Sequence, residues 1–215
     1  MSAADTGPGA VAGYPRVRAR LRRVRHTPGV PPTEGFLTIW LGGRKFHVRD
    51  EQGRSFAEVV ADVTAPRGFG VAATTMEDLM DAWRSARRPP DRGATELFGD
   101  LESGVAVVHE PRRDPWTTDV ERIAPAAEQL LTNGREAALE PSGEATYLDR
   151  PCREYRSALR GEEDGVAYRS DVTWLVSGPY VLVRDVRDSR IQGLRARTEV
   201  VELEEDGFDD AMLRP

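Results

Sequence analysis

The sequence is poor in cysteine and in long hydrophobic runs, and each shortage excludes a class of structure. Cys152 is the only cysteine, so no internal disulfide can form, which fits a reducing compartment. No stretch approaches the roughly 18 apolar residues that a membrane-spanning helix needs. The first residues hold no apolar run suited to a signal peptide, and their arginines follow the small residues instead of preceding them. As given, the chain is predicted to be cytoplasmic.

Motifs of the commonest catalytic and metal-binding classes are also missing. No G-x-x-x-x-G-K, G-x-S-x-G, H-E-x-x-H or C-x-x-C pattern occurs. The histidines have no His or Cys at the spacing of a metal pair, so no metal or cofactor is expected. Two hypotheses for an unfamiliar catalytic site stay open: His109 beside Glu110, or Cys152 with a pKa lowered by neighbouring arginines.

The composition fits one hydrophilic domain that still has enough apolar residues to form a core. The 215 residues are 39% hydrophobic and 31% charged, with a mean hydropathy of −0.51. A net charge of −6 argues against general affinity for nucleic acid. Residues 1–13 are predicted to be a disordered tail, because they are mostly Gly, Ala, Ser and Asp. Residues 14–215 are predicted to form a single domain.

Strand patterns dominate the chain. Residues 14–26 fit a strand or a helix, and the strand is favoured. Residues 35–50 predict a hairpin turned at Gly42-Gly43, and residues 104–110 a short strand. After residue 140, five alternating segments with short connections predict an antiparallel meander. They read EATYL, CREYRSAL, GVAYRSDVTWLV, PYVLVRDV and GLRARTEVVELE.

Two segments predict helices. The first covers residues 74–88, which carry one apolar stripe. The second covers residues 119–133, with Thr118 and Glu121 as its capping box and Pro125 as a kink. The elements together predict an α+β domain, with a mainly antiparallel sheet covered by about two helices.

The densest basic run lies in residues 16–25. Arg18, Arg20 and Arg22 are candidates for binding an anionic group, because guanidinium groups bind carboxylates and phosphates bidentately. The alternative is a strand face that pairs internally. The last predicted strand is acidic, so we also hypothesise that it lies beside the basic first strand, where opposite charges favour pairing.

Large apolar side chains supply a second set of candidates. Five of them could line a cavity between a curved sheet and its helices: Trp40, Met80, Trp83, Trp174 and Tyr180. The alternative is that tryptophan and methionine stripes simply form the core.

Two late segments resemble a known family. The run from Asp149 to Tyr155 and the Thr-Glu-Val with its acidic turn, from Thr198 to Asp206, are similar to late strands of the lipoprotein-carrier (LolA-like) superfamily. The resemblance implies a strongly curved half-barrel or open barrel, covered by helices and enclosing an apolar cavity for acyl chains.

These observations lead to one main functional expectation and two alternatives. The main one is a non-enzymatic protein that binds an apolar or amphipathic, lipid-like ligand in a cavity, with arginines receiving an acidic group. The first alternative is an accessory protein that binds a peptide or protein through a sheet edge or the Arg-rich segment. The second is an enzyme at His109 and Glu110 or at Cys152.

Overall fold

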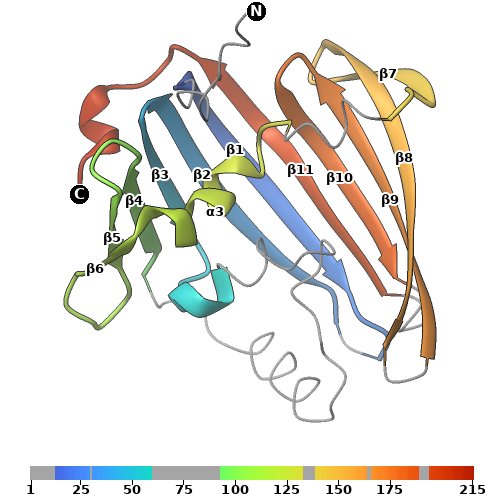
Figure 1. Ribbon diagram of the computed structural model, residues 1–215, viewed down its shortest axis with the longest axis horizontal. Coiled ribbons are helices and arrows are strands. Elements are labelled where there is room, and N and C mark those ends of the chain that lie inside the picture. Colours follow the sequence, from blue (N-terminus) through green and yellow to red (C-terminus); the bar gives the residue numbers. More distant parts are fainter. Residues whose placement is uncertain (1–12, 30, 60–92, 133–138, 164–165, 189–193) are drawn as a thin grey trace, which may run out of the picture.

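A computed structural model describes residues 13–29, 31–59, 93–132, 139–163, 166–188 and 194–215. These form one open antiparallel sheet of eleven strands in the order β6-β5-β4-β3-β2-β1-β11-β10-β9-β8-β7 (Figure 1). Every neighbouring pair is antiparallel. The predicted α+β class, with an open and mainly antiparallel sheet, is confirmed. The predicted disordered tail lies outside the described residues, except for Gly13.

The strands on the N-terminal side of the sheet are β1 (Tyr14–His26), β2 (Thr33–Gly43), β3 (Lys45–Asp50), β4 (Thr95–Asp100), β5 (Val105–His109) and β6 (Trp116–Asp119). Those on the C-terminal side are β7 (Gly143–Tyr147), β8 (Arg150–Glu163), β9 (Val166–Ser177), β10 (Tyr180–Asp188) and β11 (Leu194–Glu205). Residues 14–26 are thus a strand, and the five-stranded meander is confirmed. Strands β4 and β6 were not predicted.

Over β1 to β5 the hydrophobic core lies on one face of the sheet, which we call the inner face. Along β1, Val17, Ala19 and Leu21 are buried on this face, while the arginines between them lie on the other, the outer face. The same alternation continues in the neighbouring strands. Other fully buried core residues are Leu37, Ile39, Leu41, Phe46, Val48, Leu97, Ala106 and Val108.

Short helices cover the inner face over β2 and β3. The helix α3 (Ala124–Glu128), which follows the turn η1 (Val120–Arg122), lies in front of the sheet in Figure 1. In and beside these two elements, Ile123, Ala127 and Leu130 belong to the core. A helical turn at residues 56–59 adds Phe56 and Val59.

The predicted helix over residues 119–133 is wrong in length and in its cap. Asp119 ends β6, and the 3₁₀ turn and helix that follow are separated by Ile123. Pro125, in the first turn of α3, lacks the N–H that would continue a helix from upstream. The turn has no side-chain cap, so the proposed capping box does not form. The predicted helix over residues 74–88 lies outside the described residues.

Two tight turns show how the strands are joined. The first hairpin is confirmed, but its turn is Gly43-Arg44, since Gly42 pairs with Lys45. Gly43 has φ 59°, which the first position of a type II′ turn requires. Between β7 and β8, Leu148 and Asp149 both have positive φ, which is unusual for residues with side chains.

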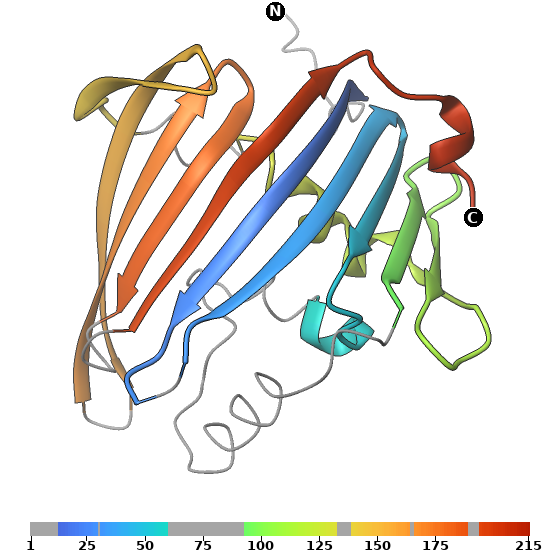
Figure 2. The ribbon, with the colours of Figure 1, turned by 180° about the vertical axis from the view of Figure 1, so that it is seen from behind.

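The two charged strands lie side by side, as hypothesised. Strand β1 runs antiparallel to β11, with Arg18 opposite Glu204, Arg20 opposite Glu202 and Arg22 opposite Glu199. This pairing joins the first half of the chain to the C-terminal meander in one sheet (Figure 2).

Candidate functional site on the inner face of the sheet

A second apolar region lies on the inner face, over β8, β9 and β10. The register establishes the face: Trp174 pairs with Arg184, Arg184 with Thr198, and Thr198 with Arg23. Arg23 follows the core residue Leu21 by two positions, so all four share its face. Helix α3 lies over β2 and β3, away from this region (Figure 1).

We call this region the inner-face strip. Its members are Tyr155, Val172, Trp174, Val176, Val181 and Val186. They form two groups that are separate from the main core, and Trp174 contacts both. Five of the six are at most 9% exposed, whereas Trp174 is only partly buried. Among the described residues outside the sheet, Leu139 packs against it.

Positive charge borders the strip. Arg184 lies beside Trp174, and Arg23 and Arg25 continue the same face on β1. Arg23 donates a hydrogen bond of 2.6 Å from Nη2 to Oε1 of Gln129 at the end of α3. An apolar cluster with a partly buried tryptophan and arginines at its border suits a ligand that has an apolar body and an acidic end.

The predicted cavity residues do not all lie together. Trp174 belongs to the strip. Tyr180 is 4% exposed and packs in the main core, where burial and the nearby Glu205 raise its pKa. Trp40 lies on the outer face, where its ring stacks on that of His47. Met80 and Trp83 lie outside the described residues, so their roles stay predictions.

The three candidate anion-binding arginines lie on the outer face, and each is paired with glutamates. Arg18 contacts Glu202 and Glu204 at 3.3 and 3.2 Å. Arg20 contacts Glu51 at 3.0 Å and Glu202 at 3.8 Å. The alternative of an internally paired strand face is confirmed. An anion bound here would displace carboxylates, so anion binding stays a prediction.

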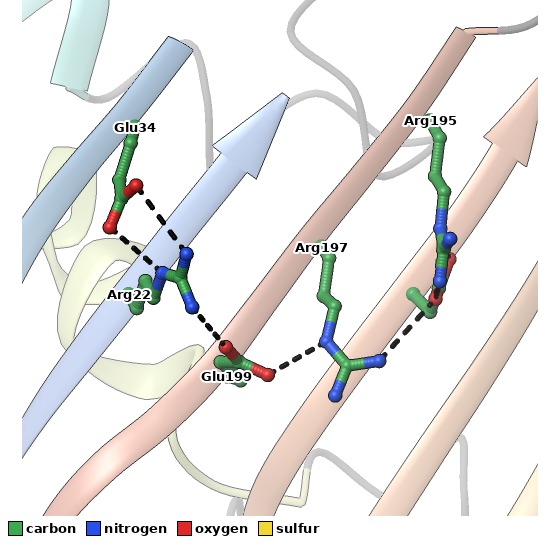
Figure 3. A network of polar contacts seen from close by, with 6 residues as sticks. Arg22, Glu34, Arg195, Arg197 and Glu199 are labelled. Carbon is green, nitrogen blue, oxygen red and sulfur yellow. Dashed lines mark hydrogen bonds and ion pairs between the residues drawn. The ribbon is translucent and has the colours of Figure 1, made fainter. Parts of the chain in front are cut away.

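Arg22 belongs to a ladder of charges that crosses four strands (Figure 3). It contacts Glu34 on β2 at 2.9 Å and Glu199 on β11 at 3.4 Å. Glu199 accepts a second hydrogen bond, of 2.7 Å, from Nε of Arg197. Arg197 and Arg195 continue the ladder to Asp185 on β10. The ladder ties the two halves of the sheet together.

His109 and Glu110 do not form a catalytic pair. His109 lies on the outer face with its ring near that of Phe98, and Glu110 is buried on the other side, because neighbouring strand residues point oppositely. Glu110 accepts a hydrogen bond of 2.7 Å from the Phe56 N–H and contacts Arg113 at 3.0 Å. Burial alone would raise the pKa of Glu110, but these hydrogen bonds outweigh it and lower the pKa.

A hollow of about 380 Å³ borders Glu110. Its lining includes Gly53, Ser55, Glu58, Glu110, Pro111, Arg112 and Arg113. The mixed charges favour no single ligand, and an ionised Glu110 that already accepts two hydrogen bonds is poorly placed to move a proton.

Cys152 has the surroundings of a structural thiol. It is 4% exposed, and its Sγ lies 3.4 Å from the backbone oxygen of Arg150. Burial raises its pKa, although Arg150 opposes the shift. A reactive cysteine needs a lowered pKa, so the hypothesised lowering of the Cys152 pKa by neighbouring arginines does not occur.

Two further features concern metal ions and membranes. Within the described ranges, no three His, Cys, Asp or Glu side chains gather as metal ligands do. None of the helices in the described part of the chain has both the length and the apolar character to cross a membrane.

Comparison with known proteins gives a fold resemblance. No family model matches the chain, and no curated protein matches its sequence. A LolA superfamily protein of Nitrosomonas europaea matches over 94% of this chain and 90% of its own, with 9% identity and a TM-score of 0.39. A DUF1329 family protein of Desulfovibrio piger matches over 95% and 90%, with 10% identity and a TM-score of 0.36. The structure therefore resembles LolA-like proteins weakly, as the sequence indicated.

Most of the inner-face strip was missed by sequence reasoning. Its valines alternate with polar residues along β9, a signal that predicts one buried face of a strand. The alternation alone does not distinguish valines that pack in the main core from valines that form a separate cluster, because that difference depends on the order of the strands in the sheet.

Proposed function

We propose that the chain binds an apolar or amphipathic ligand, such as a long acyl chain with an acidic end, along the inner-face strip. The observation that carries the proposal is the strip itself: an apolar cluster on the inner face of the sheet, separate from the main core, in which the largest side chain, Trp174, is only partly buried. Arg184 beside Trp174 supports an acidic end group.

Native mass spectrometry of the full chain with palmitic acid tests this proposal. A saturable one-to-one complex is expected for the wild type, and Trp174→Glu should lose it, because a charge on the strip opposes apolar contact. Val105→Glu is the matched control: Val105 is a 45% exposed apolar residue near the far edge of the sheet, and its replacement should leave binding unchanged. Absence of a wild-type complex, or equal loss in both variants, contradicts the proposal.

A second candidate is binding of an extended peptide at the edge of β8. Strand β7 pairs only with Arg150–Glu154, whereas β8 continues to Glu163. Within the described ranges, no other strand joins the free side of residues 155–163. An open edge of this kind offers backbone groups to an added strand.

A proline substitution tests the second candidate. Ala158→Pro removes one backbone N–H from β8. Pull-down from a host extract should recover a partner with the wild type and not with the variant. A partner retained equally by both contradicts edge binding.

A further inference from the structure

A histidine on the outer face is buried between two aromatic rings. The His47 ring stacks on Trp40 at a centroid distance of 4.5 Å and on Phe98 at 4.1 Å, with interplanar angles of 12° and 15°. His47 is 4% exposed. In the described part of the chain, neither ring nitrogen makes a hydrogen bond of normal geometry. Such a site favours the neutral imidazole.

The C-terminal end of the chain covers this stack. We call residues 208–213 the C-terminal cap; it includes the 3₁₀ turn η3 (Asp210–Leu213), which contacts β2 and β3 (Figure 2). Leu213 is 7% exposed, and its Cδ1 lies 3.0 Å from the position that a Cβ on Gly42 would take. Met212 lies next to His47 through its backbone.

Among the described residues, the polar contacts that hold the cap lie near the surface. The guanidinium of Arg16 lies 4.6 Å from the Phe208 ring centroid and hydrogen-bonds the Phe208 carbonyl and the Asp210 carboxylate. The Asp210 side chain is 68% exposed, so this ion pair contributes little. Burial of Leu213 and of the aromatic stack is the main attraction between cap and sheet.

We propose that the C-terminal cap is an acid-released cover: protonation of His47 detaches residues 208–213 and exposes the aromatic surface of Trp40, His47 and Phe98. A protonated imidazole needs hydrogen-bond acceptors or water. The closed cap keeps water away and offers the ring the Met212 backbone, and the loss of water outweighs this contact. Opening the cap hydrates the ring while leaving the sheet paired. This inference does not depend on ligand binding at the inner face.

Burial lowers the pKa of His47 to about 4, assisted by the charges of Arg49 and His109 and opposed by the Met212 backbone. Glu96 is the nearest acid, with Oε1 3.8 Å from His47 Nε2, but it also lies 3.7 Å from Arg49 Nε. Further charged groups on the surrounding elements form pairs with each other: Lys45 with Asp100, Arg18 with Glu202 and Glu204, and Arg16 with Asp210. Asp209 and Arg214 flank η3 at its two ends.

The sign of the pH effect follows from this lowered pKa. Above the ordinary histidine pKa of about 6.5, His47 is neutral whether the cap is closed or open, so protonation does not weaken the closed cap. As the pH falls from about 6.5 towards 4, the open state takes up the proton first. If opening restores the ordinary pKa, the ratio of closed to open cap falls about 20-fold between pH 7 and pH 5.

Hydrogen exchange measured by mass spectrometry tests the cover. After correction for intrinsic rates, protection of residues 206–215 should fall about 20-fold between pH 7 and pH 5 while residues 150–177 keep theirs. His47→Phe keeps a stacked ring and cannot be protonated, so its cap should show no pH response. His26→Phe is the matched control, because His26 is exposed at the end of β1 opposite Arg195 and away from the cap, and it should retain the response.

Three results would overturn the proposal: cap protection unchanged in the wild type, an equal fall in His47→Phe, or equal loss of protection across the sheet, which indicates global unfolding. Arg49→Gln gives an independent check if His47→Phe does not fold, because Arg49 is half-exposed. Its loss should raise the pKa of His47 in the closed state and reduce the response below 20-fold. An undiminished response in this variant contradicts the role of His47.

Discussion

Removing Glu199 should destabilise the protein more than removing any other glutamate that pairs with β1. Its side chain is only 14% exposed and contacts Arg22 and Arg197 at 3.4 and 2.7 Å. A hydrogen bond to a charged group contributes about 1.5–3 kcal/mol, and the exposure of both arginines reduces this. We therefore expect Glu199→Ala to cost about 2 kcal/mol, since it also leaves neighbouring positive charges without their shared carboxylate.

Urea unfolding with linear extrapolation measures this cost. Glu204→Ala is the matched control: Glu204 pairs with Arg18 at 3.2 Å across the same two strands, but its side chain is 51% exposed. An exposed pair contributes about 0.2–1 kcal/mol, so the two variants should differ by at least about 1 kcal/mol. Equal costs would refute the reasoning that burial makes the Glu199 ladder important.

Three further changes test the fold. Gly99→Ala should cost about 3 kcal/mol in urea unfolding, because its Cβ would lie 2.1 Å from Cζ of the buried Phe46, whereas Gly143→Ala, with its nearest atom 4.0 Å away, should cost little. Glu110→Ala should cost about 1–3 kcal/mol, since it leaves the Phe56 N–H without its acceptor. Because folding lowers the pKa of Glu110, the stability that Glu110 adds is present above about pH 4.5 and should be lost at lower pH. If the wild type loses no more stability than the variant as the pH falls, this reasoning is contradicted. Replacing Leu148-Asp149 with Asn-Gly should raise stability by about 1 kcal/mol, because both positions have positive φ; a lower melting temperature would contradict the turn assignment.

The sequence was most informative where strands are long and joined by short turns. The meander and β1 were predictable because alternation and turn residues agree over many positions. Strand β4 was missed because its six residues include Gly99, a weak strand former, and its stability comes from pairing with β3 and β5.

The site was less predictable than the fold. The charge pattern predicted that β1 and β11 lie together, because opposite charges recur along both. It could not place Trp40 and Trp174 on opposite faces, since a tryptophan fits either face and only the register decides. Likewise, nothing local in the sequence shows that residues 208–213 cover His47, because that contact joins segments far apart in the chain.

Contact between the ligand and Trp174 is the central claim, and fluorescence quenching tests it most directly. A dibrominated stearic acid quenches only tryptophans that it touches or nearly touches. We predict saturable quenching in the wild type that Trp174→Phe removes, since phenylalanine keeps the apolar strip but not the emitting ring. Equal quenching in Trp174→Phe, or no saturable quenching of the wild type, would contradict binding at the inner-face strip.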